Sequence, residues 1–450
     1  MTVAQDIARF AASLDAAKLA PKTRDTVRRL LLDVSGLCLA ARNEDYVEAA
    51  LSSAVAQGPS TAIGHARGFA PYDAALVNGT AAHGEDYDDT FEGGPVHSGA
   101  VIVPAVLAAC EHRKLSGAEV VKGVAAGVEI MCRMSLVAPQ ATHKASFHPT
   151  AVFGAPAAAV GVATALGLAA DQIVNAIGIA GSLASGIIEY LADGSSTKRL
   201  HAGSSAQSGI RAALLAEAGF SGPKTVLEGT HGFYKAFAPS KSPDFAPLLD
   251  GLGSRFVLET LAFKPYACGT MTQPFIDCAI ELAREVKAND IVSMVCEVGE
   301  GTVHRLWEPL AQKHSPPNGY AAKFSSPYCI AVGFLDGKAG FKEFSEARVH
   351  DPEVRALAAK VGYVIDPKNE YPKNFTGHIR ATLKDGSVRE VRKGHMRGGA
   401  HEPLSDAEIR TKFFDNAEYG GWPRARAEEL ARALDRIASG GPIDLSSARG

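Results

Sequence analysis

The stretch Thr150-Ala-Val-Phe-Gly-Ala-Pro-Ala-Ala-Ala-Val-Gly-Val-Ala-Thr-Ala-Leu-Gly-Leu168 carries no charge and consists mainly of alanine, glycine and aliphatic residues. We interpret it as a buried helix, because small residues allow neighbouring helices to approach closely. Alanine-rich stretches of the same kind recur at residues 74–82, 101–113, 118–138 and 171–182. Within residues 3–56, apolar side chains recur at three- and four-residue steps. The sequence therefore predicts a compact, mostly α-helical core.

The residue pattern changes after about Ser254. Alternating or β-branched residues predict strands at residues 256–263, 291–298, 376–383 and 384–391. Asp385-Gly386 is a hairpin turn signal, so we expect an antiparallel sheet. Helical patterns cover residues 273–287, 324–335 and 405–438.

These patterns predict a mostly α protein with two domains, as its length of 450 residues also favours. A large, all-helical domain begins with residues 1–262, and a smaller α+β domain with an antiparallel sheet covers residues 263–400. Residues 401–450 are expected to form C-terminal helices that return to the helical domain.

Composition excludes several classes of protein. The 46 Lys and Arg residues and 49 Asp and Glu residues are mixed along the chain, and the net charge of -3 argues against a nucleic-acid partner. The seven cysteines are scattered without a CxxC pair, which favours a reducing compartment and gives no metal-binding spacing. We see no signal region and no uninterrupted membrane span, so we expect a soluble, cytoplasmic protein without membrane contact.

Polar residues are concentrated in His83-Gly-Glu-Asp-Tyr-Asp-Asp-Thr-Phe-Glu-Gly-Gly-Pro-Val-His97-Ser-Gly99, between two apolar stretches. Its five carboxylates are Glu85, Asp86, Asp88, Asp89 and Glu92. Charges this dense are costly to bury without partners, so we interpret the stretch as one wall of an active site. The alternative is that Asp88, Asp89 and Thr90 only cap a helix.

Two further stretches carry histidines and cations. His148 precedes Pro149, which would begin a helix, and a helix N-terminus disfavours imidazolium. Lys198 and His201 lie three residues apart, on one face if helical, where they can hold carboxylates. The alternatives are a histidine that bridges helices and a solvated loop. Residues 181–186 are rich in glycine and serine but lack phosphate-loop spacing, so a close helix contact or a substrate-facing turn is the better reading.

The last two stretches lie in the second half of the chain. Lys264, Tyr266 and Cys268 follow a predicted strand at the expected domain junction, where pockets usually form. Cys268 is read equally well as a small packing residue. For Tyr320 and Lys323 two interpretations are open: their side chains reach a cleft, or they only face water. Together, the candidate residues suit a small substrate with two or three carboxylates, because lysines hold charge and a histidine or aspartate moves a proton.

The motifs HGEDYDDTFEGGPVHSG (83–99), FHPTAVFG (147–154), DGSSTKRLHAG (193–203) and FKPYACG (263–269), in this order, resemble those of the MmgE/PrpD family. The resemblance covers essentially the whole chain. It implies a large helical domain, a smaller α+β lid domain, chemistry without metal or cofactor, and a homodimer. Two departures stand out: Tyr266, Cys268 and Gln273 lie where relatives often carry a histidine, and the spacing before His97 is one residue longer than in the decarboxylase branch.

Carried over by motif, the site comprises two groups of residues. The resemblance implies proton transfer by His97 or His148, with Asp86 orienting a histidine or completing the polar network. By motif, Thr90, Lys198 and Lys264 are expected to bind substrate. Tyr266, His201 and Tyr320 are added as substrate-binding candidates from the residue pattern alone.

The function implied is a metal-independent lyase of a small di- or tricarboxylate, first of all a 2-methylcitrate-dehydratase-like hydro-lyase. An epimerase or racemase of an iminodisuccinate-like dicarboxylate and a cis-aconitate-type decarboxylase would use the same proton transfer. A catalytically silent polycarboxylate-binding protein is the alternative of another class.

Overall fold

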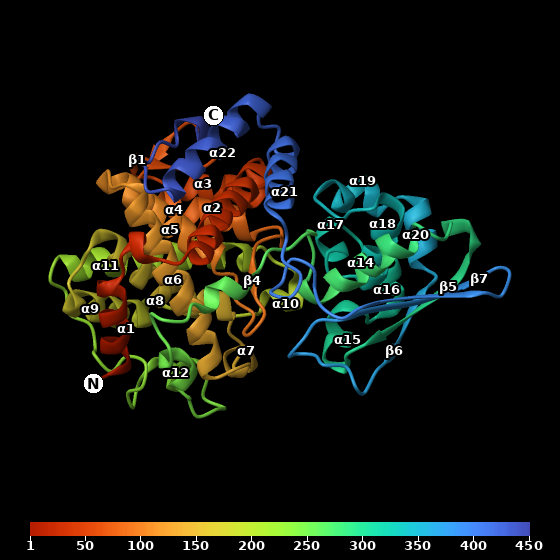
Figure 1. The fold of residues 1–450 in the computed structure, drawn as a ribbon, viewed down its shortest axis with the longest axis horizontal. Helices are drawn as coiled ribbons and strands as arrows, with labels where there is room; N and C mark the ends of the chain where they lie inside the picture. The colour runs from red at the N-terminus through yellow and green to blue at the C-terminus, as the bar shows by residue number, and fades with distance from the viewer. The chain divides into compact units, whose positions relative to one another are not determined.

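The computed structural model describes residues 1–450, and the chain divides into two compact units. Unit 1 comprises Met1–Gly84, Asp88–Leu261 and Asp406–Gly450, and unit 2 comprises Glu85–Tyr87 and Ala262–Ser405 (Figure 1). The three residues Glu85–Tyr87 therefore belong to unit 2, although the sequence on either side of them belongs to unit 1.

Unit 1 is built from helices, as its alanine-rich stretches predict (Figure 1). Its α-helices are α1 (Val3–Ser13), α2 (Pro21–Ala41), α3 (Asp45–Ser53), α4 (Pro71–His83), α5 (Gly99–Arg113), α6 (Gly117–Val137), α7 (Ala141–Lys144), α8 (Pro149–Leu166), α9 (Ala170–Leu183), α10 (Tyr190–Asp193), α11 (Thr197–Glu217), α12 (Phe233–Phe237), α13 (Ala246–Leu249), α21 (Asp406–Tyr419) and α22 (Arg424–Ala438). Its short strands are β1 (Gln57–Thr61), paired with β2 (Gly68–Phe69), and β3 (Thr90–Phe91), while β4 (Leu261–Ala262) spans the unit boundary.

The centre of unit 1 is α8, which packs against α5, α6, α9 and α11. Small residues permit these close contacts: a Cβ on Gly209 of α11 would lie 2.3 Å from the Cβ of Ala158 in α8. A Cβ on Gly79 of α4 would likewise lie 2.6 Å from the Cα of Gly203 in α11. By length and composition alone α8 is able to cross a membrane, but 89% of it is buried inside the structure, as expected of a core helix.

The C-terminal pattern at 405–438 forms two helices, α21 and α22. The chain breaks at Gly420 and Gly421, because a Cβ on Gly420 would lie 1.9 Å from the carbonyl oxygen of Leu39 and Gly421 has a positive φ of 70°. α21 packs on α2, and the buried Lys412 forms an ion pair of 2.7 Å with the buried Asp33. These contacts join the C-terminal helices to the N-terminal part of unit 1.

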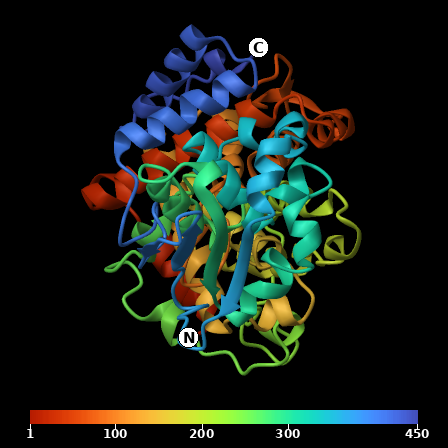
Figure 2. The same ribbon diagram turned by 90° about the vertical axis from the view of Figure 1, so that its right-hand side faces the viewer.

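Unit 2 contains a four-stranded sheet and short helices (Figure 2). Its strands are β5 (Ile291–Val298), β6 (Val361–Ile365), β7 (Gly377–Leu383) and β8 (Val388–Lys393), in the order β6-β5-β7-β8. Its α-helices are α14 (Gln273–Leu282), α15 (Glu300–Leu306), α16 (Leu310–His314), α17 (Gly319–Ala322), α18 (Ser326–Asp336), α19 (Glu346–Val349) and α20 (Pro352–Ala358). α14 packs against β7, β8 and α18.

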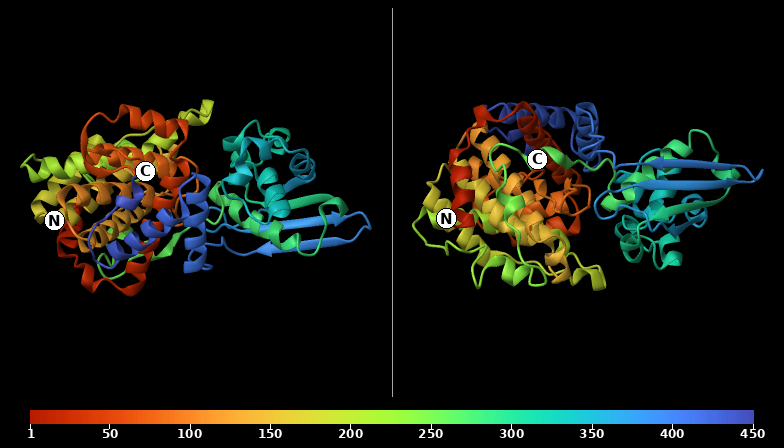
Figure 3. Two further views of the ribbon diagram at one scale, coloured as in Figure 1. Left: turned by 90° about the horizontal axis from the view of Figure 1, so that it is seen from above. Right: turned by 60° about the horizontal axis from the view of Figure 1, so that its bottom comes forward.

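The prediction of a mostly α protein with a smaller α+β part is confirmed, but two details were wrong. The sheet is mixed: β5 and β7, and the hairpin strands β7 and β8, are antiparallel, while β6 runs parallel to β5 (Figure 3). The predicted strand at 256–263 is instead a 3₁₀ helix, Val257–Thr260, followed by the two residues of β4. The backbone N–H groups of Val257 and Leu258 donate to the buried Glu129 carboxylate, so this segment needs no neighbouring strand.

Candidate active site

The polar stretch after α4 is held in place through Asp89. One Asp89 oxygen accepts from the backbone N–H of Gly99 at 2.9 Å and the other from the Ser98 hydroxyl at 3.0 Å. These bonds satisfy donors at the start of α5, so for Asp89 the helix-capping interpretation is correct. The backbone N–H of His97 donates to the Thr150 hydroxyl at 3.2 Å, which ties this loop to α8. The loop is thus fixed at two points around His97.

The adjacent carboxylate, Asp88, contacts two histidines rather than a helix. Its Oδ2 lies 2.7 Å from Nδ1 of His83, and its Oδ1 lies 3.3 Å from Nδ1 of His97. Nδ1 of His97 also lies 2.8 Å from the carbonyl oxygen of Asp89. The side chains of Asp88 and His83 are fully buried, whereas 11% of the His97 side chain is exposed.

The contacts fix where the protons lie on these rings. A carbonyl oxygen only accepts, so the neutral His97 carries its proton on Nδ1 and presents a lone pair on Nε2. Burial alone would raise the pKa of the Asp88 carboxyl, but the charges of His97 and His83 and the hydrogen bond from His83 bring it well below its usual range. Asp88 is therefore ionised at neutral pH, and an imidazolium formed at His97 would have a carboxylate beside it.

The neighbouring Asp89 titrates differently. Burial and the charge of Asp88 raise the pKa of the Asp89 carboxyl to about 7, against the opposing hydrogen bond from Gly99. Two adjacent carboxylates thus differ in protonation because one faces two imidazoles and the other faces a helix end.

A second pair of histidines lies next to the first. His148 is the N-cap residue of α8, and its backbone N–H donates to the carbonyl of Gly186 at 2.9 Å. Its Nδ1 lies 3.0 Å from Nδ1 of His201, which lies in α11. Gly186 has a φ of +115°, and a Cβ there would lie 2.5 Å from the Cβ of Ala151. The glycine- and serine-rich stretch therefore serves a close backbone approach beside this pair.

The second pair is neutral at physiological pH. Burial and then the charges of His83 and Lys198 lower the pKa of His148 well below its usual value, and the same causes lower the pKa of His201 to about 4. Since only one of the two facing Nδ1 atoms carries a proton, one ring presents an Nε2–H donor and the other an Nε2 lone pair. The pair therefore offers one hydrogen-bond donor and one acceptor.

Together, four imidazoles form a continuous cluster in unit 1. The ring centroid of His83 lies 5.0 Å from that of His97 and 5.5 Å from that of His148, which lies 5.2 Å from that of His201. Tyr190 contacts the outer pair edge-on. We call His83, Asp88, His97, His148 and His201 the histidine cluster.

Sequence reasoning found part of this cluster. His97, His148 and His201 come together as a group, and the charge of Lys198 acts on three of the four rings, while Thr90 is buried in β3. His83 and Asp88 received no role, although both lie in the stretch that we interpreted as a site wall. The sequence did carry a signal for His83: it ends an apolar helix that is expected to be buried, where an imidazole without a partner is costly.

The residues Glu85–Tyr87 are bound within unit 2. Nζ of Lys264 donates to the carbonyl and to Oδ1 of Asp86, both at 2.8 Å, and Asp86 has a positive φ of 58°. Nζ of the buried Lys323 lies 2.7 Å from a carboxylate oxygen of Glu85. The Tyr87 hydroxyl donates to the carbonyl of Pro265 at 2.9 Å. Asp86 and Lys264 are therefore brought together, and the carboxylate that contacts histidines is that of Asp88.

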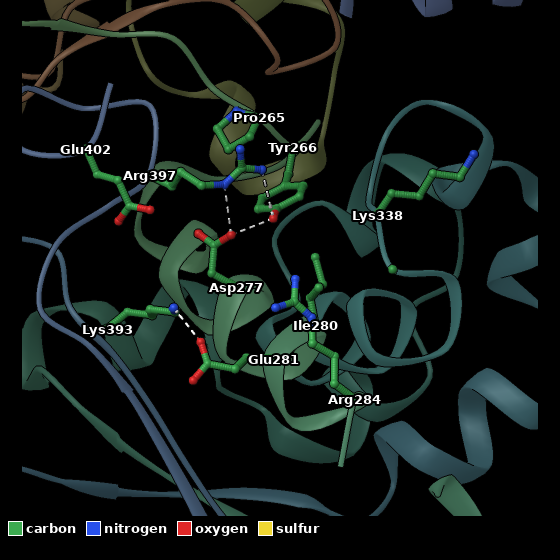
Figure 4. A pocket seen from close by; sticks show the side chains of 11 residues that line it. Pro265, Tyr266, Asp277, Ile280, Glu281, Arg284, Lys338, Lys393, Arg397 and Glu402 are labelled. Carbon is green, nitrogen blue, oxygen red and sulfur yellow. Dashed lines mark hydrogen bonds and ion pairs between the residues drawn. The ribbon is translucent and has the colours of Figure 1, made fainter. Parts of the chain in front are cut away.

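Tyr266 and Tyr320 occupy other parts of unit 2. Tyr266 lines a cavity of about 480 Å³, where its hydroxyl donates to Asp277 at 2.6 Å and Arg397 contacts both groups (Figure 4). In the same cavity, Lys393 pairs with Glu281 at 2.6 Å (Figure 4). Tyr320 lies in α17 and contacts the ring of Phe324. The charges around Tyr266 are thus largely matched by one another.

Three members of the histidine cluster are also spaced for metal binding. His83, Asp88 and His97 each offer a ligand atom, and these atoms lie within 4.8 Å of one another. The atoms closest to Asp88 are the two Nδ1 atoms, which already form the contacts described above. An ion bound between them would have to replace those contacts.

Unit 1 thus gathers one ionised carboxylate and four histidines, and unit 2 carries a mixed sheet. The MmgE/PrpD N-terminal domain matches residues 5–246 and the MmgE/PrpD C-terminal domain matches residues 266–436. The chain belongs to the MmgE/PrpD family.

Its relatives are lyases. The chain is 31% identical over 356 residues to cis-aconitate decarboxylase of Mus musculus, covering 77% of this chain and 72% of the relative. It is 27% identical over 473 residues to cis-aconitate decarboxylase of Aspergillus terreus, covering 98% and 95%. It is 25% identical over 296 residues to 2-methylcitrate dehydratase of Cupriavidus necator, covering 61% and 59%.

Proposed function

We propose that the protein is a metal-independent lyase of a small di- or tricarboxylate, and that a hydro-lyase reaction of the 2-methylcitrate dehydratase type is its first candidate activity. The observation that carries this proposal is the contrast within the histidine cluster. His97 has a carboxylate beside its Nδ1 and a free Nε2 lone pair, whereas burial and neighbouring charges lower the pKa of His148 and His201 and so make these two rings weak bases.

His97 is the base in this reaction. Its Nε2 takes a proton from the carbon next to a substrate carboxylate, and the ionised Asp88 stabilises the resulting imidazolium. The C–H electron pair forms the carbon–carbon double bond as the bond to the β-hydroxyl breaks. The proton leaves with that hydroxyl as water, so His97 returns to its starting state.

The other groups bind substrate. The His148 and His201 pair supplies one donor and one acceptor to the substrate's oxygen atoms without adding charge. Lys198, in the first turn of α11, supplies a positive charge for a carboxylate. A neutral pair beside a cation suits a substrate whose charges are all negative.

A decarboxylase is the second candidate, because cis-aconitate decarboxylases are the relatives at 31% identity and at 98% coverage of this chain. In that reaction the electron pair of the departing carboxylate remains on the substrate carbon chain. A protonated His97 would deliver the proton that completes the product. The same cluster would then act as an acid in place of a base.

Product analysis separates these reactions. Purified protein is incubated with 2-methylcitrate, citrate, cis-aconitate and iminodisuccinate, before and after dialysis against a chelator, and products are followed by proton NMR. An alkene from a hydroxy acid supports the hydro-lyase, and CO2 release from cis-aconitate supports the decarboxylase instead. Loss of optical activity from iminodisuccinate without net loss of substrate assigns an epimerase.

Two controls make a negative result informative. Lys198→Met should raise KM for every accepted substrate, whereas the exposed His350→Gln should change neither KM nor kcat. If citrate-like ligands raise the melting temperature of the wild type but no product forms at high protein concentration, the lyase proposal is wrong and the silent polycarboxylate-binding protein is correct.

A further inference from the structure

His83 is the most deeply buried ring of the histidine cluster. It is the last residue of α4, its side chain has no exposed surface, and its Nε2 has no hydrogen-bond partner. A buried acceptor without a partner costs about 1 to 3 kcal/mol, and an apolar residue at this position would avoid that cost. The side chain therefore needs an explanation beyond packing.

The chain holds His83 at this position by a close contact. A Cβ on the next residue, Gly84, would lie 2.3 Å from the Tyr46 hydroxyl, so only glycine fits there. Arg199 packs over the Tyr46 ring and donates to the carbonyl of Gly84 at 3.0 Å. The end of α4 is thus fixed from two sides, and His83 points at Asp88.

The link to the proposed base runs through Asp88. Nδ1 of His83 lies 2.7 Å from Oδ2 of Asp88, and the other oxygen, Oδ1, lies 3.3 Å from Nδ1 of His97. With Asp88 ionised, Nδ1 of His83 is the proton donor in that bond. Without this donor the buried carboxylate would be free to rotate, and its full charge would fall on the one remaining ring.

We propose that His83 is a positioning residue: it holds and shares the Asp88 carboxylate, so that one carboxylate oxygen stays beside Nδ1 of His97 while Nε2 of that ring acts as the base. This role rests on the proposed function of His97. His83 itself does not reach substrate, because its side chain is fully enclosed. The charged and titratable groups that act on His83 are Asp88, His97, His148 and Lys198, and His201 completes the cluster.

Two variants test the role. His83→Leu removes the donor to Asp88, and His83→Asn replaces it with an amide N–H near the position of Nδ1. For His83→Leu we expect kcat to fall about 10- to 100-fold with KM unchanged, the loss typical when a group that orients a metal-binding side chain is removed. The whole Asp88 charge then faces His97, so the acid limb of the kcat/KM profile should move to higher pH. His83→Asn should restore both the rate and the position of the limb.

A purely structural role predicts a different result. It would lower the folded fraction, measured by circular dichroism, and leave the acid limb of the folded enzyme in place in both variants. If folded His83→Leu keeps kcat within about threefold and an unshifted limb, the positioning role is wrong.

A measurement on the wild type covers the case in which His83→Leu does not fold. In ¹⁵N-histidine-labelled protein, the ring of His83 should show an Nδ1–H proton at low field that moves upfield in Asp88→Asn, because the charged acceptor is lost. An Nε2–H tautomer at His83 at pH 7 would overturn the proposal. This readout does not depend on activity, so it separates failure of this inference from failure of the proposed reaction.

Discussion

Replacing Asp88 by asparagine should disable the base without changing the shape of the site. Asparagine keeps one acceptor oxygen but presents an NH2 group where Asp88 offers its second oxygen. That group faces the Nδ1–H of either His83 or His97, which lie 2.7 and 3.3 Å from the two carboxylate oxygens. If it faces His83, two donors meet and that ring must turn or change its tautomer. If it faces His97, whose Nδ1–H donates to the Asp89 carbonyl, the ring stays in place but loses the neighbouring negative charge.

The size of the effect follows from these distances. A full charge 3.3 Å from an imidazolium is worth at most about 5 kcal/mol at an effective dielectric constant of about 20. Because Asp88 is shared between two rings, a loss typical of an interaction with a charged group, about 1.5 to 3 kcal/mol, is expected. Asp88→Asn should therefore lower kcat about 10- to 150-fold.

The assay is the turnover of the best substrate in the product panel, with circular dichroism to confirm folding. Asp89→Asn is the matched control, because its carboxylate binds Ser98 and Gly99 rather than a ring. Its kcat should stay within about tenfold of the wild type, a smaller loss than one charged hydrogen bond would cause. A folded Asp88→Asn variant with kcat within a factor of five of the wild type would refute the reasoning.

Three further predictions concern stability. Burial and the charge of Asp88 raise the pKa of Asp89 to about 7, so the wild type loses folding free energy as pH rises from about 4 to 7. Asp89→Asn lacks this loss. Between pH 4 and pH 8 its free energy of unfolding in urea should therefore rise by up to about 4 kcal/mol relative to that of the wild type. Burial lowers the pKa of His201 to about 4, so the wild type loses stability as pH falls from 6.5 towards 4, and His201→Phe should lose less over that range when melting temperatures are compared. Arg133→Met leaves the buried Glu129 unpaired and should cost about 3 to 5 kcal/mol; a smaller loss than 1 kcal/mol in denaturant would contradict the buried-pair assignment.

The helical core was predictable because its signals are local. Alanine, glycine and aliphatic residues in long stretches specify helices that pack closely, and the structure has helices at each such stretch, including Pro149–Leu166. The hairpin at Asp385-Gly386 was predictable for the same reason. The segment at 256–263 was not, because its backbone is satisfied by the distant side chain of Glu129.

β6 was missed because its sequence lacks a clear alternation. Val361 is buried, Gly362 and Tyr363 are half-buried, and Val364 and Ile365 are exposed. Its partner β5 lies far away in the sequence, and parallel pairing leaves no turn signal between two strands.

The choice between Asp86 and Asp88 also lay beyond the sequence. The two aspartates are separated by one residue, yet Asp86 binds Lys264 in unit 2 and Asp88 binds histidines in unit 1. Asp86 adopts a left-handed backbone conformation, with a φ of 58°, which redirects the chain between them. A left-handed backbone at a single aspartate depends on the contacts that this residue makes, here with Lys264, and cannot be predicted from the sequence.

The central claim is that His97 moves a proton on the carbon next to a carboxylate. The most direct measurement is deuterium incorporation from D2O into the panel of di- and tricarboxylates, followed by proton NMR, with wild type, His97→Gln and His350→Gln compared. We predict deuterium or a new alkene with wild type and His350→Gln, and a rate about 10²- to 10⁴-fold lower with His97→Gln. Equal exchange in a folded His97→Gln variant would contradict the claim and move the base to another residue.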